Sequence, residues 1–146
     1  MTALSADKRV QSYETGARIL ASIGAAANAV WYKGSLIARN ASGWGVAASD
    51  AANIAVVGIA REGGNNTGGS NGAKEIPIEY GGVYQLEIQG STITRANIGQ
   101  TAVVQDDQTV TNAATAANDV PIGRIVDVRD GKAWVEVGRP GWVVAP

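Results

Sequence analysis

The chain of 146 residues has the length of one typical domain, and its 45% hydrophobic residues suffice for a buried core. A formal net charge of −1 creates no long-range field that favours nucleic acid, and the absence of cysteine excludes disulfides and thiolate metal sites or nucleophiles. Histidine, the most common general base, is also absent, and no run of 18 apolar residues and no apolar N-terminal signal core is present, so we expect no enzyme, membrane span or secretion signal.

The first 24 residues are the least regular part of the chain. Their larger apolar residues, among them Leu4, Val10 and Tyr13, are spaced loosely enough for a helix or an extended segment. We expect an N-terminal arm over residues 1–24, either partly disordered or ordered on a neighbouring subunit.

Short strands follow the arm. Residues 30–32 and 35–39 alternate as strands, residues 40–43 form a turn, and residues 44–47 return. Residues 53–60 are almost uninterrupted apolar residues with several β-branched side chains, which favours a buried strand over a helix.

A loop rich in glycine and asparagine occupies residues 62–73. It has no large apolar residue to anchor it, so we expect it to be mobile. Its end resembles a phosphate-binding loop superficially, but Ala73 precedes Lys74 and a strand pattern follows, whereas the Walker motif requires Gly-Lys and then a helix.

Residues 74–88 contain two alternating runs around Gly81-Gly82. The two glycines are compatible with either a tight hairpin or a kink in one long strand. Pro77 lacks an amide donor, which predicts an edge or bulged strand. Ile76, Ile78 and Tyr80 should share one face, and Glu75, Glu79 and Glu87 are interpreted as solvated.

Two hairpins are expected between residues 101 and 137. Residues 101–105 pair with 109–111 through a turn that contains Asp106 and Asp107, which we interpret as turn residues rather than metal ligands. Asp130-Gly131 is a strong type I′ signal that pairs residues 124–129 with 132–137.

This turn predicts the register of the second hairpin. It pairs Arg129 with Lys132, and continues to Val126 opposite Val135. One face then carries Val126, Val128, Ala133, Val135 and Val137 and should be core. The other face, open to solvent or a partner, carries Trp134 with Ile125, Asp127, Arg129, Lys132 and Glu136.

The C-terminal residues 139–146 contain two prolines, so they form a poor central strand. Trp142 and Val144 are costly to leave in water, so the tail folds back or docks on a partner.

No catalytic constellation, metal-ligand cluster or cofactor motif is apparent in the sequence. Composition and spacing alone indicate a small all-β module with an arm (1–24), a β-domain (25–138) and a tail (139–146).

Several short motifs, taken in their order along the chain, resemble those of a known protein family. They are Leu4-Ser-Ala-Asp-Lys-Arg9, Tyr32-Lys-Gly-Ser-Leu-Ile37, Asn40-Ala-Ser-Gly43, Val57-Gly-Ile-Ala60, Gly82-Val-Tyr84, Ala96-Asn-Ile-Gly99, Asp106-Asp-Gln-Thr-Val110, Gly123, Asp127 and Ala133-Trp-Val-Glu-Val137. Together they span nearly the whole chain, which resembles the capsid cement or decoration proteins of tailed bacteriophages, of the type encoded beside Mu-like major capsid proteins. The loop at 62–73 and the tail from Arg139 to Pro146 depart from that pattern.

The resemblance implies a compact β-barrel or β-sandwich of short antiparallel strands with an extended N-terminal arm. It implies a non-enzymatic virion protein, made in the host cytoplasm, that binds the major capsid protein on the outer capsid surface, commonly as a homotrimer, without nucleic acid or membrane. The candidate contacts with the capsid or with other subunits are Leu4, Lys8, Arg9, Val10, Tyr13, Trp134, Trp142 and Val144.

Two alternatives remain open at this stage. The first is a tail- or fibre-associated β-module that binds host glycans through Trp134 or Trp44. The second is a hydrolase that uses carboxylates alone, with Asp106, Asp107 and Glu79 as the candidates.

Overall fold

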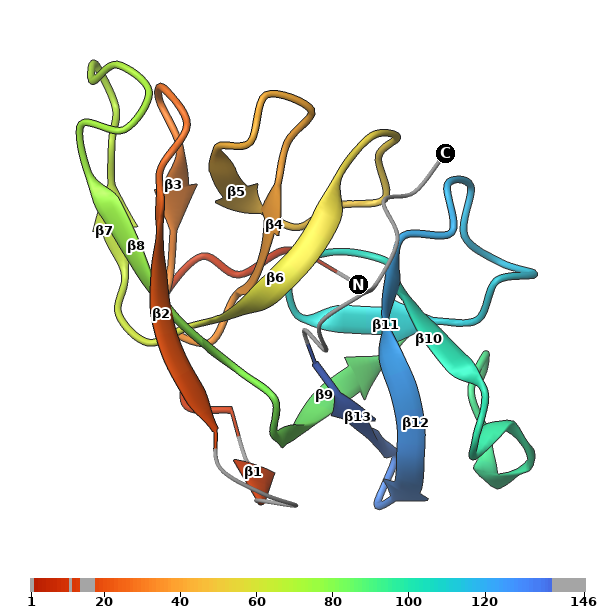
Figure 1. Ribbon diagram of the computed structural model, residues 1–146. Coiled ribbons are helices and arrows are strands. Elements are labelled where there is room, and N and C mark those ends of the chain that lie inside the picture. The colour runs from red at the N-terminus through yellow and green to blue at the C-terminus, as the bar shows by residue number, and fades with distance from the viewer. Residues whose placement is uncertain (1, 11, 14–17, 138–146) are drawn as a thin grey trace.

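The structure is a computed structural model that describes residues 2–10, 12–13 and 18–137 (Figure 1). It confirms the all-β prediction, with a small closed barrel beside a second sheet. The described part of the chain contains no helix with the length and apolar character needed to cross a membrane. The elements in chain order are β1 (Ser12–Tyr13), β2 (Ile19–Gly24), β3 (Val30–Trp31), β4 (Leu36–Arg39), β5 (Gly45–Ala47), β6 (Ala55–Ala60), β7 (Gly64–Asn65), β8 (Glu75–Tyr80), β9 (Val83–Ile88), the 3-10 helix η1 (Arg95–Asn97), β10 (Thr101–Val104), β11 (Thr109–Thr111), β12 (Pro121–Arg129) and β13 (Lys132–Glu136).

The strands form two halves that lie side by side in Figure 1. In one half, β9, β11, β10, β12 and β13 follow one another, and β13 pairs back with β9, which closes the barrel. In the other half, the sheet has the order β2-β8-β6-β4-β5, while β3 and β7 form a separate ribbon. Most pairs are antiparallel, and β11 runs parallel to β9.

The chain passes from one half to the other at Gly81-Gly82. β8 belongs to the open sheet and β9 to the barrel, so the glycines bend a continuous path instead of turning a hairpin. Pro77 pairs with Ser22 of β2, and the ladder between β8 and β6 ends next to it at Ile78. The expectation of an edge strand was therefore wrong, because the missing amide of Pro77 lies where the pairing with β6 stops.

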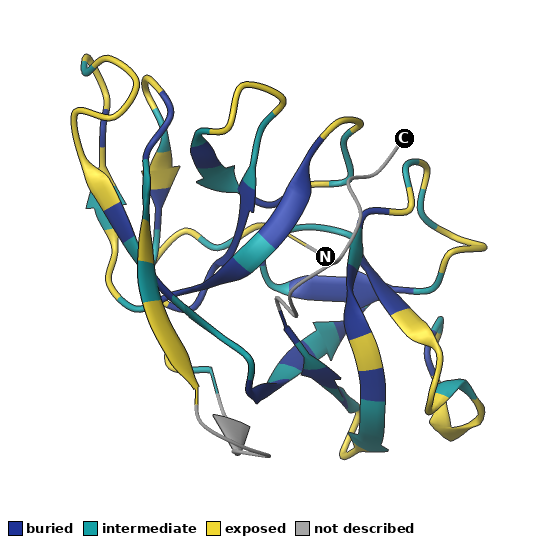
Figure 2. Cartoon of the chain, in the orientation of Figure 1, coloured by how far each residue is buried: buried dark blue, intermediate teal, exposed yellow. Residues whose placement is uncertain are grey.

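The main core lies between the two halves. Alternate residues of β4 divide between two clusters: Leu36 and Ala38 face the barrel residues, and Ile37 packs on the other side with Trp31 and Ile76. Successive side chains of a strand point to opposite faces, so β4 is buried on both faces, one toward each cluster. Figure 2 shows β6 buried except for one half-buried position in its middle, in agreement with the apolar run at 53–60.

The second hairpin follows the predicted turn but not all of the predicted register. Asp130 and Gly131 both have positive φ, and the pairs from Arg129–Lys132 to Asp127–Trp134 are as predicted. A bulge then shifts the register, so that Val135 faces Ile125 instead of Val126. Ile125 is consequently buried in the core, and its assignment to the outer face was wrong.

The loop at residues 62–73 is anchored by a polar residue. Asn66 is buried, and its side-chain amide donates to the carbonyl oxygens of Ala26 (2.9 Å) and Ser70 (3.1 Å). Gly64 and Asn65 also form β7 against β3. The expectation of a mobile loop considered apolar anchors alone, whereas an amide side chain bonds backbone carbonyls without any apolar contact.

The N-terminal residues lie against their own chain. β2 pairs with β8 over its whole length, from Ile19 opposite Tyr80 to Gly24 opposite Glu75. β1 pairs with β9 at the edge of the barrel. Residues 2–10 cross between the two halves, and their contacts form one wall of the site described next.

Candidate functional site: a basic pocket beside the N-terminal arm

The N-terminal arm, here residues 2–10, is fastened at two places. In the barrel, the Leu4 amide donates to Asp107 Oδ1 (2.8 Å) and Gln108 Nε2 donates to the Thr2 carbonyl (2.6 Å). At the turn before β4, the Lys8 amide donates to the Lys33 carbonyl (2.8 Å). The arm therefore links the barrel to the turn before β4 through its backbone groups.

Asp107 is more than a turn residue. It is 3% exposed, and besides the Leu4 amide it accepts a hydrogen bond from the Ser35 hydroxyl (3.1 Å). Burial raises the pKa of the Asp107 carboxyl above its ordinary value, although both hydrogen bonds lower it. The interpretation of Asp106 and Asp107 as simple turn residues was therefore incomplete, because Asp107 also fastens the arm.

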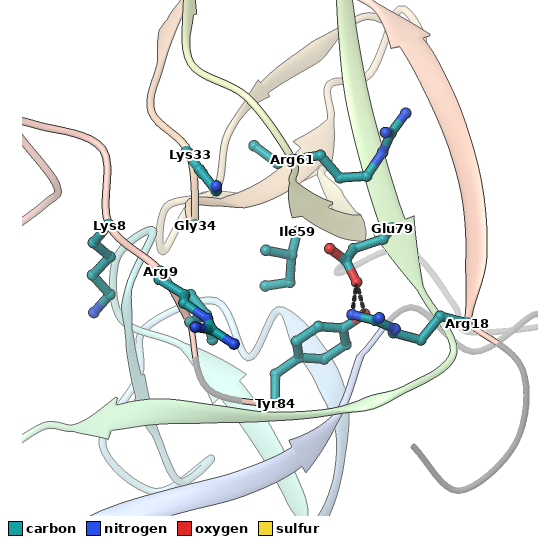
Figure 3. Close-up of a pocket in the computed structure, with 11 residues that line it drawn as sticks. Lys8, Arg9, Arg18, Lys33, Gly34, Ile59, Arg61, Glu79 and Tyr84 are labelled. Atoms are coloured by element: carbon teal, nitrogen blue, oxygen red, sulfur yellow. Dashed lines mark hydrogen bonds and ion pairs between the residues drawn. The ribbon is translucent and has the colours of Figure 1, made fainter. Parts of the chain in front are cut away.

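A cavity of about 270 Å³ opens next to the end of the arm. Figure 3 shows its residues converging from the arm, the turn before β4, the end of β6, and strands β8 and β9. Five basic side chains and one carboxylate line it. The lining residues are Lys8, Arg9, Val10, Arg18, Lys33, Gly34, Ile59, Ala60, Arg61, Glu79 and Tyr84.

The carboxylate of the pocket is engaged by two neighbours. Glu79 Oε2 lies 2.9 Å from Arg18 Nη1 and accepts a hydrogen bond of 2.9 Å from the Tyr84 hydroxyl. The pKa of that buried hydroxyl is raised, first by burial and then by the hydrogen bond and the negative charge of Glu79. The interpretation of Glu79 as a solvated residue was therefore wrong, because it pairs inside the pocket.

The remaining basic residues surround the opening of the pocket. Lys8 Nζ bonds Gln108 Oε1 (3.0 Å), and Arg61 Nε donates to the Ile78 carbonyl (3.3 Å). For Arg9 and Lys33, both exposed, no side-chain hydrogen bond or ion pair with another described residue is present. A half-enclosed site with more cations than carboxylates is suited to bind an anion.

The structure brings together part of the predicted contact set. Lys8, Arg9 and Val10 all line the pocket, and Val10 also packs on the main core. Leu4 lies outside the pocket, at the Asp107 end of the arm. Tyr13 lies in β1, and nothing is described of its side chain.

The aromatic candidates lie elsewhere. Trp134 is half-buried in β13, with the Arg129 guanidinium 4.9 Å from its ring centroid. Trp44 is half-buried and lies against the backbones of Gly24 and Gly72. Trp142 and Val144 fall outside the described residues.

Sequence reasoning missed most of the pocket. Arg18, Lys33 and Arg61 are isolated cations in the sequence, and Glu79 occupies an alternating strand position like other surface carboxylates. One signal was present in Lys33-Gly34: Gly34 has φ +90, and a Cβ there would overlap the Lys8 carbonyl. A glycine after a lysine can adopt the positive φ of a tight turn. Because glycine has no Cβ, another segment can also cross close to its backbone.

No family model matches the chain, and no curated protein or solved structure matches it. Among residues 2–10, 12–13 and 18–137, no group of three or more acidic side chains is placed to hold a metal ion. Asp107 and Glu79, two of the carboxylates considered for hydrolysis, have separate roles, one fastening the arm and one paired in the pocket. The chemistry that this site offers is anion recognition by arginine and lysine.

Proposed function

We propose that this chain is a non-enzymatic structural protein of a phage virion that binds the outer surface of the capsid and stabilises it across capsomer junctions. The ordered resemblance along nearly the whole sequence and the all-β fold support this proposal. A capsid under internal pressure fails where capsomers meet. A small protein that spans this junction adds buried area, and many copies act together through multivalency.

The observation that carries the proposal is the open edge of the five-stranded sheet. Among the described strands, β2 pairs with β8 alone. β2 contains no charged residue and no proline, and Leu20 and Ile19 are 63% and 44% exposed. Figure 2 shows this exposed strand along the outer edge of the molecule. Proteins usually protect such an edge with charge, proline or a covering segment, so an unprotected apolar edge suits a chain that binds a neighbour.

The partner that we assign to this edge is an extended segment of the major capsid protein. Addition of a strand to an open edge gives affinity through main-chain hydrogen bonds, and Ile19 and Leu20 add apolar contact. The resemblance further implies a homotrimer on the shell. Within one chain, the arm is bonded to Asp107 of the barrel and to Lys33 in the turn before β4.

The glycan-binding alternative has weaker support. A sugar platform requires an open aromatic face. Trp134 is half-buried beside Arg129, and Trp44 lies against two glycines. We therefore retain the capsid-binding proposal.

Cryo-electron microscopy of the parent phage tests the proposal directly. We expect density for this chain on the outer face of the head, around local three-fold positions. Density on the tail alone, or none on the head, overturns it.

A binding assay tests the role of the edge strand. Cosedimentation with shells that lack this protein should show binding of the native chain and at least about tenfold weaker binding of Leu20→Lys, because a lysine on an edge strand opposes pairing. The matched control is Ile98→Lys, which places the same charge at an exposed apolar residue next to η1. Equal weakening by both variants excludes β2 as the contact.

A further inference from the structure

The basic residues of this chain are concentrated at one place. Five of its 12 lysines and arginines line the pocket beside the arm, together with a single carboxylate. The formal charge of the whole chain is nevertheless −1. The pocket is thus a local positive region on a protein that is slightly acidic overall.

Glu79 does not neutralise the cations at the opening. It is one carboxylate among five cations, and its Oε2 is held by Arg18 and the Tyr84 hydroxyl on one side of the cavity. Figure 3 shows this pair against Tyr84, with Arg9 and Lys33 across the cavity from it. Cations that line a partly enclosed space repel each other, and a bound anion offsets this repulsion.

The backbone holds these cations in place. The Lys33 amide donates to Asp7 Oδ1 (2.7 Å), and the Lys33 carbonyl accepts from the Lys8 amide (2.8 Å). These bonds fix the backbone of the turn and of the arm, while the Lys33 and Arg9 side chains make no hydrogen bond or ion pair with another described residue. Arg61 follows β6 directly, and its Nε is oriented by the Ile78 carbonyl. The backbone positions and the Arg61 guanidinium are therefore preorganised, whereas the Arg9 and Lys33 side chains would become ordered on an anion.

We propose that this pocket binds carboxylate side chains of an acidic, extended segment of the capsid protein. This inference rests on the proposed function for the identity of the partner. The pocket adjoins the open edge: Arg18 precedes β2, and Leu20 of β2 pairs with Glu79 of β8. A segment added to β2 projects alternate side chains on one face, roughly 7 Å apart, so an acidic residue at one end of it can reach the pocket.

A peptide titration tests the recognition chemistry on the intact protein. The probes are a peptide of alternating glutamate and threonine, its glutamine counterpart and inorganic phosphate, each followed by the backbone amide signals of Arg9, Lys33 and Arg61 in NMR spectra. We expect the glutamate peptide to shift these signals and to bind more weakly as salt rises. Equal binding of the glutamine peptide overturns the inference, and so does tighter binding of phosphate than of the glutamate peptide.

Two double variants test whether the cations of the pocket bind the peptide. Arg9→Gln/Lys33→Gln removes two charges that make no described side-chain bond, and Lys74→Gln/Arg124→Gln removes two charges elsewhere. We expect about tenfold weaker binding of the glutamate peptide by the first variant and nearly native binding by the second. Equal affinities for the two variants overturn the assignment.

Shell binding separates this inference from the proposed function. The Arg9/Lys33 variant should bind shells about tenfold more weakly than the Lys74/Arg124 variant. If both bind like the native chain, the capsid function stands and the pocket inference fails. If the native chain itself does not bind shells, the capsid function and the named partner fail, while the peptide titration still decides whether the pocket recognises carboxylates.

Discussion

The backbone amide of Leu4 lies 2.8 Å from the Asp107 carboxylate, across 103 residues of sequence. Asp107 also accepts the Ser35 hydroxyl, and its own carbonyl accepts the Leu36 amide (2.7 Å). One buried residue in the β10–β11 turn is therefore bonded to the arm and to the start of β4. This relationship joins the N-terminus to both halves of the fold.

Loss of that carboxylate should release the arm. Asp107→Ala leaves the Leu4 amide and the Ser35 hydroxyl without this acceptor, so we expect a loss of about 1–3 kcal/mol in the free energy of unfolding. Urea denaturation measures this loss, and faster tryptic cleavage after Lys8 and Arg9 reports arm release. The control is Asp106→Ala, whose carboxylate accepts the Gln108 amide within the turn. If both variants accelerate cleavage equally, Asp107 does not hold the arm.

The same residue predicts a dependence of stability on pH. Burial raises the pKa of the folded-state Asp107 carboxyl above 3.8, so the native state binds this proton more tightly than the unfolded state. The stabilising contribution of Asp107 is thus fully present below its unfolded pKa and is lost as pH rises through its folded pKa. Asp107→Asn removes the titration, so this variant should gain stability relative to the native chain as the pH rises above 3.8.

Urea denaturation at several pH values in this range tests the prediction. The informative quantity is the difference in free energy of unfolding between the two proteins, followed as a function of pH. A difference that does not change with pH arises from the altered hydrogen bonds alone. Two parallel profiles would show that Asp107 does not titrate differently on folding.

The hairpins show which parts of the fold the sequence could predict. Asp130 and Gly131 form their turn with φ of 54° and 72°, and this requirement is local chemistry visible in two residues. The bulge before Asp127 was not predictable from alternation, because Ile125 and Val126 are both apolar and either can face the core. The turn residues therefore predicted the strand register close to the turn, but not four residues away from it.

The pocket could not be predicted for a different reason. Arg9, Lys33 and Arg61 belong to separate segments, and each is an ordinary single cation in the sequence. They meet because the arm crosses the turn at Gly34, where the Lys8 amide bonds the Lys33 carbonyl and the Lys33 amide bonds Asp7. A site assembled by such long-range packing leaves no periodicity or spacing motif in the chain.

A close approach of two barrel strands gives a prediction on packing. A Cβ added at Gly123 of β12 would overlap the carbonyl oxygen of Glu136 in β13, and backbone atoms cannot rotate away. We expect Gly123→Ala to prevent closure of the barrel or to lower the free energy of unfolding by more than about 3 kcal/mol. A side chain that overlaps a backbone atom can be accommodated only if a whole strand shifts. Thermal and urea unfolding measure this cost.

Gly131→Ala is the matched control. Gly131 has φ +72 and no heavy atom within 4 Å of an added Cβ, so this variant tests backbone strain without a clash. It should cost about 1 kcal/mol. Equal losses in the two variants would mean that the strand contact at Gly123 relaxes easily.

The last prediction concerns the aromatic residue on the outer face of the second hairpin. The Arg129 guanidinium lies 4.9 Å from the Trp134 ring centroid, and its Nε lies 2.8 Å from Asp127 Oδ2. Arg129→Ala should lower the free energy of unfolding by about 0.5–1 kcal/mol and increase quenching of tryptophan fluorescence by acrylamide, because the ring loses its cover. Arg124→Ala removes an exposed arginine that is paired with Glu136 at 3.6 Å and should change stability by less than about 0.5 kcal/mol without altered quenching. If the two variants behave alike, the contact between Arg129 and Trp134 contributes nothing beyond a surface ion pair.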